Sequence, residues 1–291
     1  MPVYFDHNAT TPLAPAVMEA MLPYMSSIYG NPSSVHRYGR LARNALEQAR
    51  QQVADLLGAQ ANQVVFTSGG TEANNLALKG SLQAHQPARL ALSAIEHAAM
   101  LGPAAQLEKA GWQLDLIPVD AQGVVTEDAL QQALSRQTQL VSVMAANNET
   151  GVLQNLPALV NAARSVRENL LFHSDACQMA GKLPLNFAEL DLDMLTLSAH
   201  KLYGPQGAGA LIVSRRIDLQ PQISGGGQES GRRSGTENLA AIVGFGQAAE
   251  LAAQRQQHRV EQALAVRQRL QQARREQQGL TGISLEGVRL P

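Results

Sequence analysis

The segment from Met194 to Pro205 places a lysine where its amine could do chemistry. Residues Met194 to Ser198 are predicted to form a buried strand, and Lys201 follows just before a Gly-Pro turn. A lysine at the exit of a buried strand can be desolvated, which favours its neutral and nucleophilic form. The alternative is an ordinary solvated lysine at the start of a loop. The role of Lys201 therefore depends on which chemical groups other segments of the chain place near its amine.

Two further strand ends carry side chains that suit the same chemistry. Asp175 closes a predicted strand and could keep a pyridine nitrogen protonated, with Gln178 as a hydrogen-bond partner for a ring oxygen. His97 follows the strand Leu90 to Ile95 and could stack on a ring and move protons near neutral pH. Singly, the aspartate also fits a turn cap and the histidine a structural role. Together with an amine, these groups suit pyridoxal phosphate.

Two glycine-rich turns could hold a phosphate group. The strand Val64 to Thr67 runs into Ser68 to Asn75, where glycines precede a predicted helix whose free amides suit an anion, with Thr71 adding a hydroxyl. The alternative is a plain strand-to-helix turn capped by Thr71. Neither the Walker spacing nor the dinucleotide fingerprint is present. The loop Gly225 to Asn238 leads into a long predicted helix with Thr236 at its start, and it could equally be a hinge between lobes.

Two other polar features are less specific. The turn Asn147 to Gly151 closes a strand, and its amides could bind a carboxylate or a ring oxygen, although alone it is simply a turn. Cys177 is expected to be a small buried residue and not a nucleophile, because no activating base stands beside it in the sequence. A single cysteine excludes an internal disulfide framework and an all-cysteine metal site, and we expect no metal cofactor.

Composition limits the function classes. The chain has 291 residues, of which 45% are hydrophobic and 16% charged, enough for one large core with a smaller lobe attached. The formal net charge is -1 and no basic stripe is present, so nucleic acid is not an expected partner. No secretory signal and no membrane-length apolar run occur in the sequence. A cytoplasmic enzyme without a membrane partner is expected.

Seven apolar segments are predicted to form strands, and helices alternate with them. The predicted strands are Val64 to Ser68, Leu90 to Ile95, Leu114 to Val119, Leu140 to Ala145, Leu171 to Ala176, Met194 to Ser198 and Ala210 to Val213. This alternation predicts an α/β domain with a mainly parallel sheet flanked by helices. Because open sheets bind ligands beyond the carboxyl ends of their strands, we expect His97, Asn148, Asp175 and Lys201 to meet.

Apolar residues at three- and four-residue spacing predict helices between the strands. The predicted helices are Gly39 to Leu57, Thr71 to His85, Ala98 to Ala110, Glu127 to Leu134 and Leu156 to Asn169. From Thr236 to about Gln278 the helical pattern predicts a long helix that leaves the main domain. Asn8 to Pro12 and Tyr29 to Ser34 are expected to be loops arranged over a site. The tail Thr281 to Pro291 could supply one strand of a second lobe.

In combination, these motifs resemble the class I cysteine desulfurases of the class V aminotransferase group. The matching segments are Asp6 to Pro12, Gly30 to Ser34, Phe66 to Glu72, Glu96-His97, Asn147 to Gly151, Asp175 to Gln178, Ser198 to Lys201 and Arg233 to Thr236. The resemblance covers nearly the whole chain. It implies the type I pyridoxal-phosphate fold, with a seven-stranded large domain and a small domain, assembled as a homodimer.

The resemblance also implies a role for each matching position. Lys201 corresponds to the lysine that forms the Schiff base, Asp175 to the partner of the pyridine nitrogen, and His97 to the ring-stacking acid and base. Gln178 and Asn148 would lie near the ring oxygen and the substrate. The phosphate would be held by Gly70, Thr71, Ser198 and His200, with Thr236 reaching the phosphate of the other subunit.

The resemblance further implies an activity and a division of the chain. The family converts L-cysteine to L-alanine and passes the sulfur, as an enzyme persulfide, to acceptor or scaffold proteins for iron-sulfur cluster assembly. Its mobile cysteine and its substrate-binding arginine belong to a region beyond the end of this sequence, so a C-terminally truncated enzyme is expected. We expect an N-terminal segment over the site at 1–14, a large cofactor-binding domain at 15–252, and a long helix starting an incomplete small domain at 253–291.

Two alternatives remain open from the sequence. A selenocysteine lyase, or a related lyase or transaminase of the same fold, would share the cofactor residues. A non-catalytic remnant that binds the cofactor, or that dimerises with a full-length paralogue, would also keep them.

Overall fold

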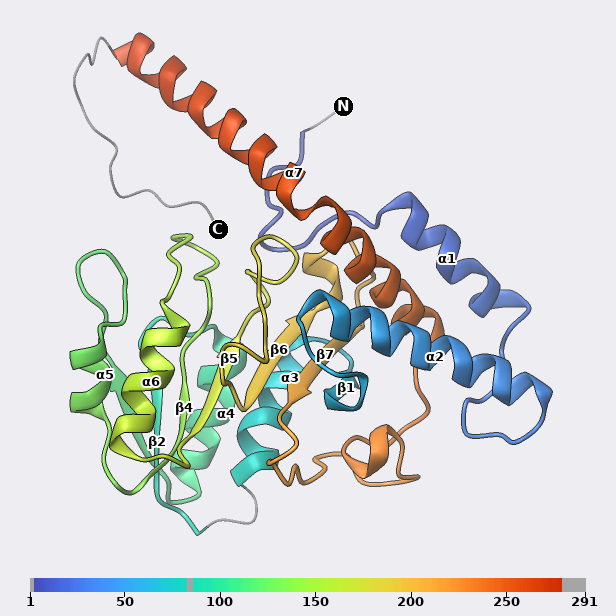
Figure 1. Ribbon diagram of the computed structural model, residues 1–291, viewed down its shortest axis with the longest axis horizontal. Helices are drawn as coiled ribbons and strands as arrows, with labels where there is room; N and C mark the ends of the chain where they lie inside the picture. The colour runs from blue at the N-terminus through green and yellow to red at the C-terminus, as the bar shows by residue number, and fades with distance from the viewer. Residues whose placement is uncertain (1–2, 83–85, 279–291) are drawn as a thin grey trace.

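A seven-stranded sheet with helices on both faces forms the body of the molecule (Figure 1). The structure, a computed structural model, describes residues 3–82 and 86–278. Its strands are β1 (Val64–Thr67), β2 (Arg89–Ser93), β3 (Gln113–Ile117), β4 (Thr138–Ser142), β5 (Leu171–Asp175), β6 (Met194–Ser198) and β7 (Gly209–Val213). All seven coincide with predicted strands to within a few residues at their ends.

The strand order across the sheet is β1-β7-β6-β5-β4-β2-β3. The pairs that link β6, β5, β4, β2 and β3 are parallel, whereas β7 runs antiparallel to both of its neighbours, β1 and β6. The prediction of a mainly parallel sheet is therefore confirmed. Six strands end at the same edge of the sheet, and the loops that follow them gather there.

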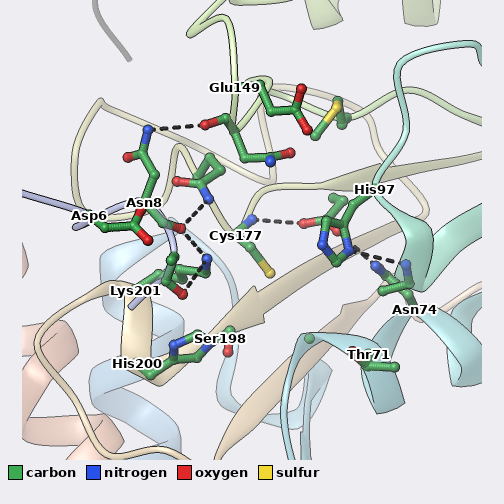
Figure 2. A pocket seen from close by; sticks show the side chains of 17 residues that line it. Asp6, Asn8, Thr71, Asn74, His97, Glu149, Cys177, Ser198, His200 and Lys201 are labelled. Carbon is green, nitrogen blue, oxygen red and sulfur yellow. Dashed lines mark hydrogen bonds between the residues drawn. The ribbon is translucent and has the colours of Figure 1, made fainter. Parts of the chain in front are cut away.

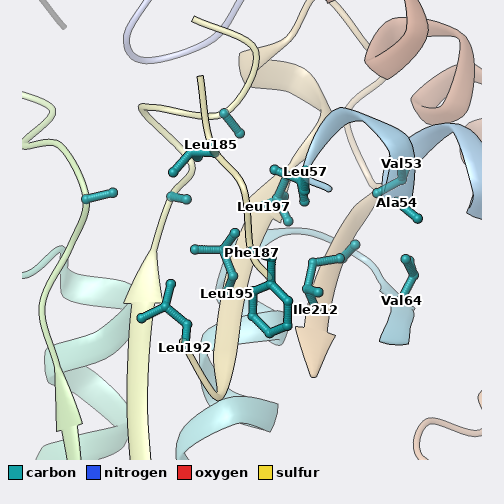
Figure 3. Packing of buried hydrophobic residues seen from close by; sticks show 14 of the residues in the cluster. Val53, Ala54, Leu57, Val64, Leu185, Phe187, Leu192, Leu195, Leu197 and Ile212 are labelled. Carbon is teal, nitrogen blue, oxygen red and sulfur yellow. The ribbon is translucent and has the colours of Figure 1, made fainter. Parts of the chain in front are cut away.

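Side chains alternate between the two faces of the sheet, and each face has its own apolar cluster. On β1, Val64 and Phe66 join one cluster, whereas Val65 joins the other. Figure 3 shows part of the first cluster, which includes Leu57 and Leu197. Full burial of side chains of this size stabilises the fold by about 1.5–3 kcal/mol each.

Helices cover both faces of the sheet. The first cluster includes residues from α2 (Arg37–Leu56), α5 (Glu127–Ala133), α6 (Leu156–Val166) and α7 (Leu239–Gln278). The second includes residues from α3 (Gly70–Asn75), from the π-helix Leu76–Gly80 that continues it, and from α4 (Ala98–Lys109). Every helix predicted from the sequence is present, although the predicted end of the α3 helix, at 83–85, lies outside the described residues.

Helix α1 (Pro15–Ser26) was not predicted, and α7 begins later than predicted. Pro15 suits a helix start, but Pro23 lies inside α1 and breaks the sequence pattern by which helices are recognised. Helix α7 begins at Leu239 and not at Thr236, because Asn238 caps it: its side-chain oxygen accepts a hydrogen bond from the backbone N–H of Ala241 at 3.3 Å.

Helix α7 is 40 residues long and changes character along its length. Buried side chains occur as far as Ala252, where the helix packs against α1 and α2, and residues 253–274 are mostly exposed. Figure 1 shows this second half projecting away from the sheet. The division at residue 252 remains a prediction, and the strand predicted near the C-terminus lies outside the described residues. None of the helices described between residues 3 and 278 combines the length and apolar character of a transmembrane span.

A buried ion pair attaches the glycine-rich loop at 225–238 to the edge of the sheet. The guanidinium of Arg50 on α2 donates to both carboxylate oxygens of Glu229, at 2.7 and 2.8 Å. The backbone N–H of Phe66 also donates to Glu229, at 2.8 Å, and Arg50 donates to the carbonyl of Val64 at 2.9 Å. The loop is therefore fixed to β1 by charged and backbone groups together.

We expect Arg50→Met to lower the free energy of unfolding by about 3–5 kcal/mol, because it leaves Glu229 buried without its partner. Urea denaturation at neutral pH measures the change. Arg40→Met, at an exposed position on the same helix, serves as the matched control and should cost less than about 1 kcal/mol. Equal effects of the two substitutions would contradict the structural role of the ion pair.

Candidate active site

A cavity of about 570 Å³ opens where the loops that follow β1, β2, β4, β5 and β6 meet (Figure 2). This volume is within the range of small-molecule and cofactor sites. Nine of the ten predicted site residues line it: Gly70, Thr71, His97, Asn148, Asp175, Gln178, Ser198, His200 and Lys201. The expectation that the strand-end residues meet is confirmed, because the parallel strands end at one edge.

Thr236 lies elsewhere. It lines a second pocket with Tyr29 and Asn31, next to α1. Its loop is held to the region of the first cavity, since Arg233 donates to Glu72 of α3 at 2.8 Å. The role of Thr236 toward a second subunit therefore remains a prediction.

Lys201 ends the 3-10 turn Ala199–Lys201 that follows β6 directly. Its amine donates hydrogen bonds to the backbone carbonyls of Asn8 and Ala9, the latter at 2.9 Å. Burial lowers the pKa of Lys201, while the charges of Asp175 and Asp6 act in the opposite direction. The net effect increases the fraction of neutral amine, which is the nucleophilic form.

The carboxylate of Asp175 is held in one orientation by two donors. Asn74 donates to one oxygen at 2.7 Å, and the backbone N–H of Cys177 donates to the other at 2.9 Å. Asp175 is only 6% exposed, and Asn74 is completely buried. Asn74 is not among the predicted residues, although its position one turn after Gly70 on the same helix was a usable signal.

His97 serves as the N-cap of α4 while facing the cavity (Figure 2). Its Nδ1 accepts a hydrogen bond from the backbone N–H of Ala99 at 3.1 Å. A neutral imidazole that accepts at Nδ1 carries its proton on Nε2. His97 therefore caps a helix and also lines the cavity. The two roles are compatible because the cap fixes the ring in place.

Glu96, beside His97 in the sequence, links the end of β2 to the segment that follows β4 by hydrogen bonds. One of its oxygens accepts from the hydroxyl of Ser93 at 2.7 Å and from the backbone N–H of Met144 at 2.6 Å. Burial raises the pKa of Glu96 to about 8, and the charge of Asp175 adds to this shift. The buried carboxyl group is therefore mainly protonated at neutral pH.

The predicted phosphate cradle is shared between the main cavity and an adjoining one of about 420 Å³. Both are lined by Gly70, Thr71, Ser198 and His200. Glycine is required at position 70, because a Cβ atom there would lie 2.8 Å from the Sγ of Cys177. Burial and the neighbouring charge of Lys201 lower the pKa of His200, whose Nδ1 lies 3.1 Å from the hydroxyl of Thr10.

The N-terminal segment lies over the cavity, as expected of a loop arranged over a site. Asp6, Asn8 and Ala9 all contribute to the lining. The side-chain amide of Asn8 donates to the carbonyl of Asn148 at 3.1 Å, and Gln178 donates to the carbonyl of Asn8 at 2.9 Å. The two predicted polar residues are thus joined to the segment that covers them.

Cys177 lines the cavity but is a poor nucleophile. Burial raises the pKa of its thiol well above the usual range, and the nearby charge of Asp175 raises it further. Its Sγ lies 4.0 Å from the carbonyl oxygen of Thr196, within reach of a weak hydrogen bond. The raised pKa agrees with the expectation that Cys177 is not a nucleophile, whereas the residue is half-buried and not fully buried as expected. In the described parts of the chain, no three His, Cys, Asp or Glu side chains group as a metal site would require.

The donor set fits pyridoxal phosphate. An amine and a carboxylate face one cavity, beside hydroxyl groups and the first amides of a helix that suit a phosphate. The lack of a side chain at Gly70, at that helix start, leaves room for Cys177 and Ser198, which line the same cavity. A pyridoxal-phosphate-dependent protein of the type I fold is the class that this sheet and this site define.

Comparison with known proteins identifies the family. The model of the aminotransferase class-V family matches residues 3–285, and the chain belongs to this family, whose members depend on pyridoxal phosphate. Over 252 residues the chain is 45% identical to "Cysteine desulfurase IscS" of Dictyoglomus turgidum, covering 86% of this chain and 64% of that protein. The chain thus spans less than two thirds of that relative's length.

Solved structures show the same likeness. A NifS-like protein superposes with a TM-score of 0.87 at 38% identity, covering 89% of this chain and 71% of that one. The structure of SspA in complex with cysteine superposes with a TM-score of 0.82 at 40% identity, covering 86% and 72% of the two chains.

Glu96 generates a pH prediction. The folded protein holds its proton up to about pH 8, whereas an unfolded glutamate loses it near pH 4.5, so stability falls as pH rises between these values. Burial lowers the pKa of His173 to about 4. This residue therefore has the opposite effect on the pH dependence of stability, but only below about pH 6.5. From pH 6.5 to 8 we expect the parent protein to lose about 1–2 kcal/mol more than Glu96→Gln.

Urea denaturation at the two pH values measures this difference. Glu108→Gln, at an exposed position on α4, is the control and should follow the parent protein. If the parent and Glu96→Gln show the same pH dependence, Glu96 does not carry the extra proton.

Proposed function

We propose that this chain is the cofactor-binding part of a pyridoxal-phosphate-dependent cysteine desulfurase. The reaction takes L-cysteine to L-alanine and transfers the sulfur as a persulfide to an acceptor or scaffold protein, for iron-sulfur cluster assembly and other sulfur compounds. One observation carries the proposal: the amine of Lys201 and the fixed carboxylate of Asp175 face a single cavity with His97. Likeness to a named desulfurase, and to a protein whose structure is in complex with cysteine, supports the substrate.

In this proposal the cofactor is held at both ends by residues of the chain. Lys201 would supply the amine that binds it, and Asp175, whose carboxylate is fixed by Asn74, would pair with the ring nitrogen. Thr71 and His200, with Gly70 and Ser198, would hold the phosphate. When bound, pyridoxal phosphate withdraws electrons from the substrate carbon next to the amino group.

The proton transfers of the proposed reaction are assigned to side chains of the chain itself, His97 and Lys201. His97 would stack on the ring and would carry its proton on Nε2, because Nδ1 accepts the hydrogen bond that caps α4. Lys201, whose pKa is lowered by burial, would serve as a base in the same cavity when its amine is not bonded to the cofactor. Cys177 has no part in sulfur transfer in this proposal, since its thiol is held protonated by burial.

We also propose that the protein acts as a homodimer and works in the cytoplasm. Large apolar side chains are exposed on the N-terminal part of the molecule: Phe5 is 88% exposed, Val35 83% and Tyr29 76%. Tyr29 stacks on the exposed Tyr38, with ring centroids 6.2 Å apart, and adjoining exposed apolar groups favour coverage by a partner. Tyr29 and Thr236 line the same pocket, which supports the proposal that Thr236 serves the phosphate site of a second subunit.

The cofactor site is tested by absorbance. We expect the chain supplied with pyridoxal phosphate to show a band near the visible edge, and Lys201→Ala to lose it because the proposed bonding amine is removed. Lys109→Ala, at an exposed position of α4, should retain the band. Borohydride reduction followed by peptide mass analysis should place the cofactor on Lys201.

The response to L-cysteine separates the functions that share this site. A change of the band and formation of L-alanine would support a desulfurase, whereas transfer of the amino group to the cofactor would indicate a transaminase. An unchanged band would indicate a non-catalytic remnant. Preference for selenocysteine over cysteine in the same assay would indicate a lyase of that type.

Cys177 should react slowly with thiol reagents in the folded protein. Because burial and Asp175 raise the pKa of its thiol, we expect modification by Ellman's reagent at pH 7.5 to be at least about 10-fold slower than in the urea-unfolded chain. We accordingly expect little sulfide release from L-cysteine through this thiol. Rapid modification, with sulfide release that Cys177→Ser abolishes, would contradict this assignment.

A further inference from the structure

Lys182 is a second lysine at the edge of the site, and neither the sequence motifs nor the proposed mechanism gives it a role. It follows Gln178 by four residues, in the segment that comes after β5. Its amine donates to the side-chain oxygen of Gln178 at 2.9 Å and to the side-chain oxygen of Asn8 at 3.2 Å. One ammonium group thus contacts two amide side chains, both of which line the cavity.

An ammonium group can only donate hydrogen bonds, whereas an amide side chain has an accepting oxygen end and a donating NH₂ end. Lys182 therefore fixes which end of each amide faces it. With its oxygen toward the lysine, Gln178 directs its nitrogen to the backbone carbonyl of Asn8 at 2.9 Å. Asn8 in turn directs its side-chain nitrogen to the backbone carbonyl of Asn148 at 3.1 Å.

Two consequences reach the cavity. An NH₂ group has two N–H bonds, so Gln178 keeps one for a ligand oxygen after donating to Asn8. The backbone carbonyl of Asn8, held by Gln178, is also an acceptor for the amine of Lys201. The orientation of both amides therefore affects the groups closest to the bonding amine.

We propose that Lys182 is a positioning residue for the cofactor site, which orients the Gln178 amide so that its N–H faces the ring oxygen of the cofactor. The same contact holds Asn8, and with it the N-terminal segment, over Lys201. This inference rests on the proposed pyridoxal-phosphate site.

The electrostatic surroundings of Lys182 agree with this role. Burial, together with the charge of Lys201, lowers its pKa to about 8, while Cys177 acts in the opposite direction. The lysine is therefore still mainly protonated at pH 7, and a protonated amine is the form that can only donate.

The pH at which the band of the bound cofactor converts between its two forms tests the proposal. A donor at the ring oxygen and a nearby positive charge both lower the pKa of the nitrogen that links Lys201 to the cofactor. We expect Lys182→Met to raise the midpoint by about 0.5–1 pH unit, the size of one lost hydrogen bond. Lys109→Met, at an exposed position, should leave it unchanged.

A double-mutant cycle separates orientation from charge. If Lys182 acts through Gln178, the shift caused by Lys182→Met should fall to less than half in a Gln178→Leu background. An equal shift in both backgrounds would show that Lys182 acts by its charge alone, and would overturn the proposal. Lys182→Gln, which offers either end of an amide, should shift the midpoint in the same direction and provides a second variant if Lys182→Met folds poorly.

The outcomes also distinguish this inference from the proposed function. If the parent chain shows no cofactor band, both the site and the role of Lys182 are wrong. If the parent shows the band and Lys182→Met leaves its midpoint unchanged, only the role of Lys182 is wrong. Thermal melting of each unloaded variant verifies that a shifted midpoint does not come from unfolding.

Discussion

The parallel pairing of β5 with β6 is the constraint on which the site depends. It sets Asp175 opposite Thr196, two residues before β6 ends at Ser198. The 3-10 turn that follows β6 then brings Lys201 to the same edge of the sheet. An acid and an amine that are 26 positions apart in the sequence thereby face one cavity, without any flexible loop having to position either of them.

Buried polar groups beneath the cavity make this arrangement rigid. His173 lies between the hydroxyls of Ser142 and Thr196, each at 2.9 Å, and burial lowers its pKa to about 4. Glu96 joins the ends of β2 and β4 in a similar way. Because an unpartnered buried polar group is costly, such contacts hold the strand ends in one relative position.

Two segments remote in the sequence complete the site from outside the sheet. The N-terminal segment contacts residues almost 200 positions away, since the backbone N–H of Thr11 donates to the carbonyl of His200 at 2.9 Å. The glycine-rich loop is held by Arg50 at one point and by Glu72 at another. These contacts use charged and backbone groups, so they fix the position of the loops more than an apolar contact would.

Much of this protein was determined by local sequence pattern. Apolar runs and helical spacing gave the seven strands, most of the helices and the parallel sheet, because periodicity reports which side chains a folded element buries. Strand-end polar residues such as Asp175 and Lys201 could be selected for the same reason. Helix α1 was not predicted because Pro23 interrupts its pattern. The start of α7 was predicted at Thr236 because threonine and asparagine are both common helix caps, and only the folded geometry shows that Asn238 is the cap.

The tertiary structure alone decided which side chains support the site. Asn74 contacts Asp175 across 101 positions of sequence, and Lys182 contacts Asn8 across 174. No pattern within one element encodes these pairs, because they depend on how strands and loops are brought together. The sequence determined which residues could do chemistry, and the fold decided what orients them, since hydrogen bonds between distant segments form only once the chain has folded.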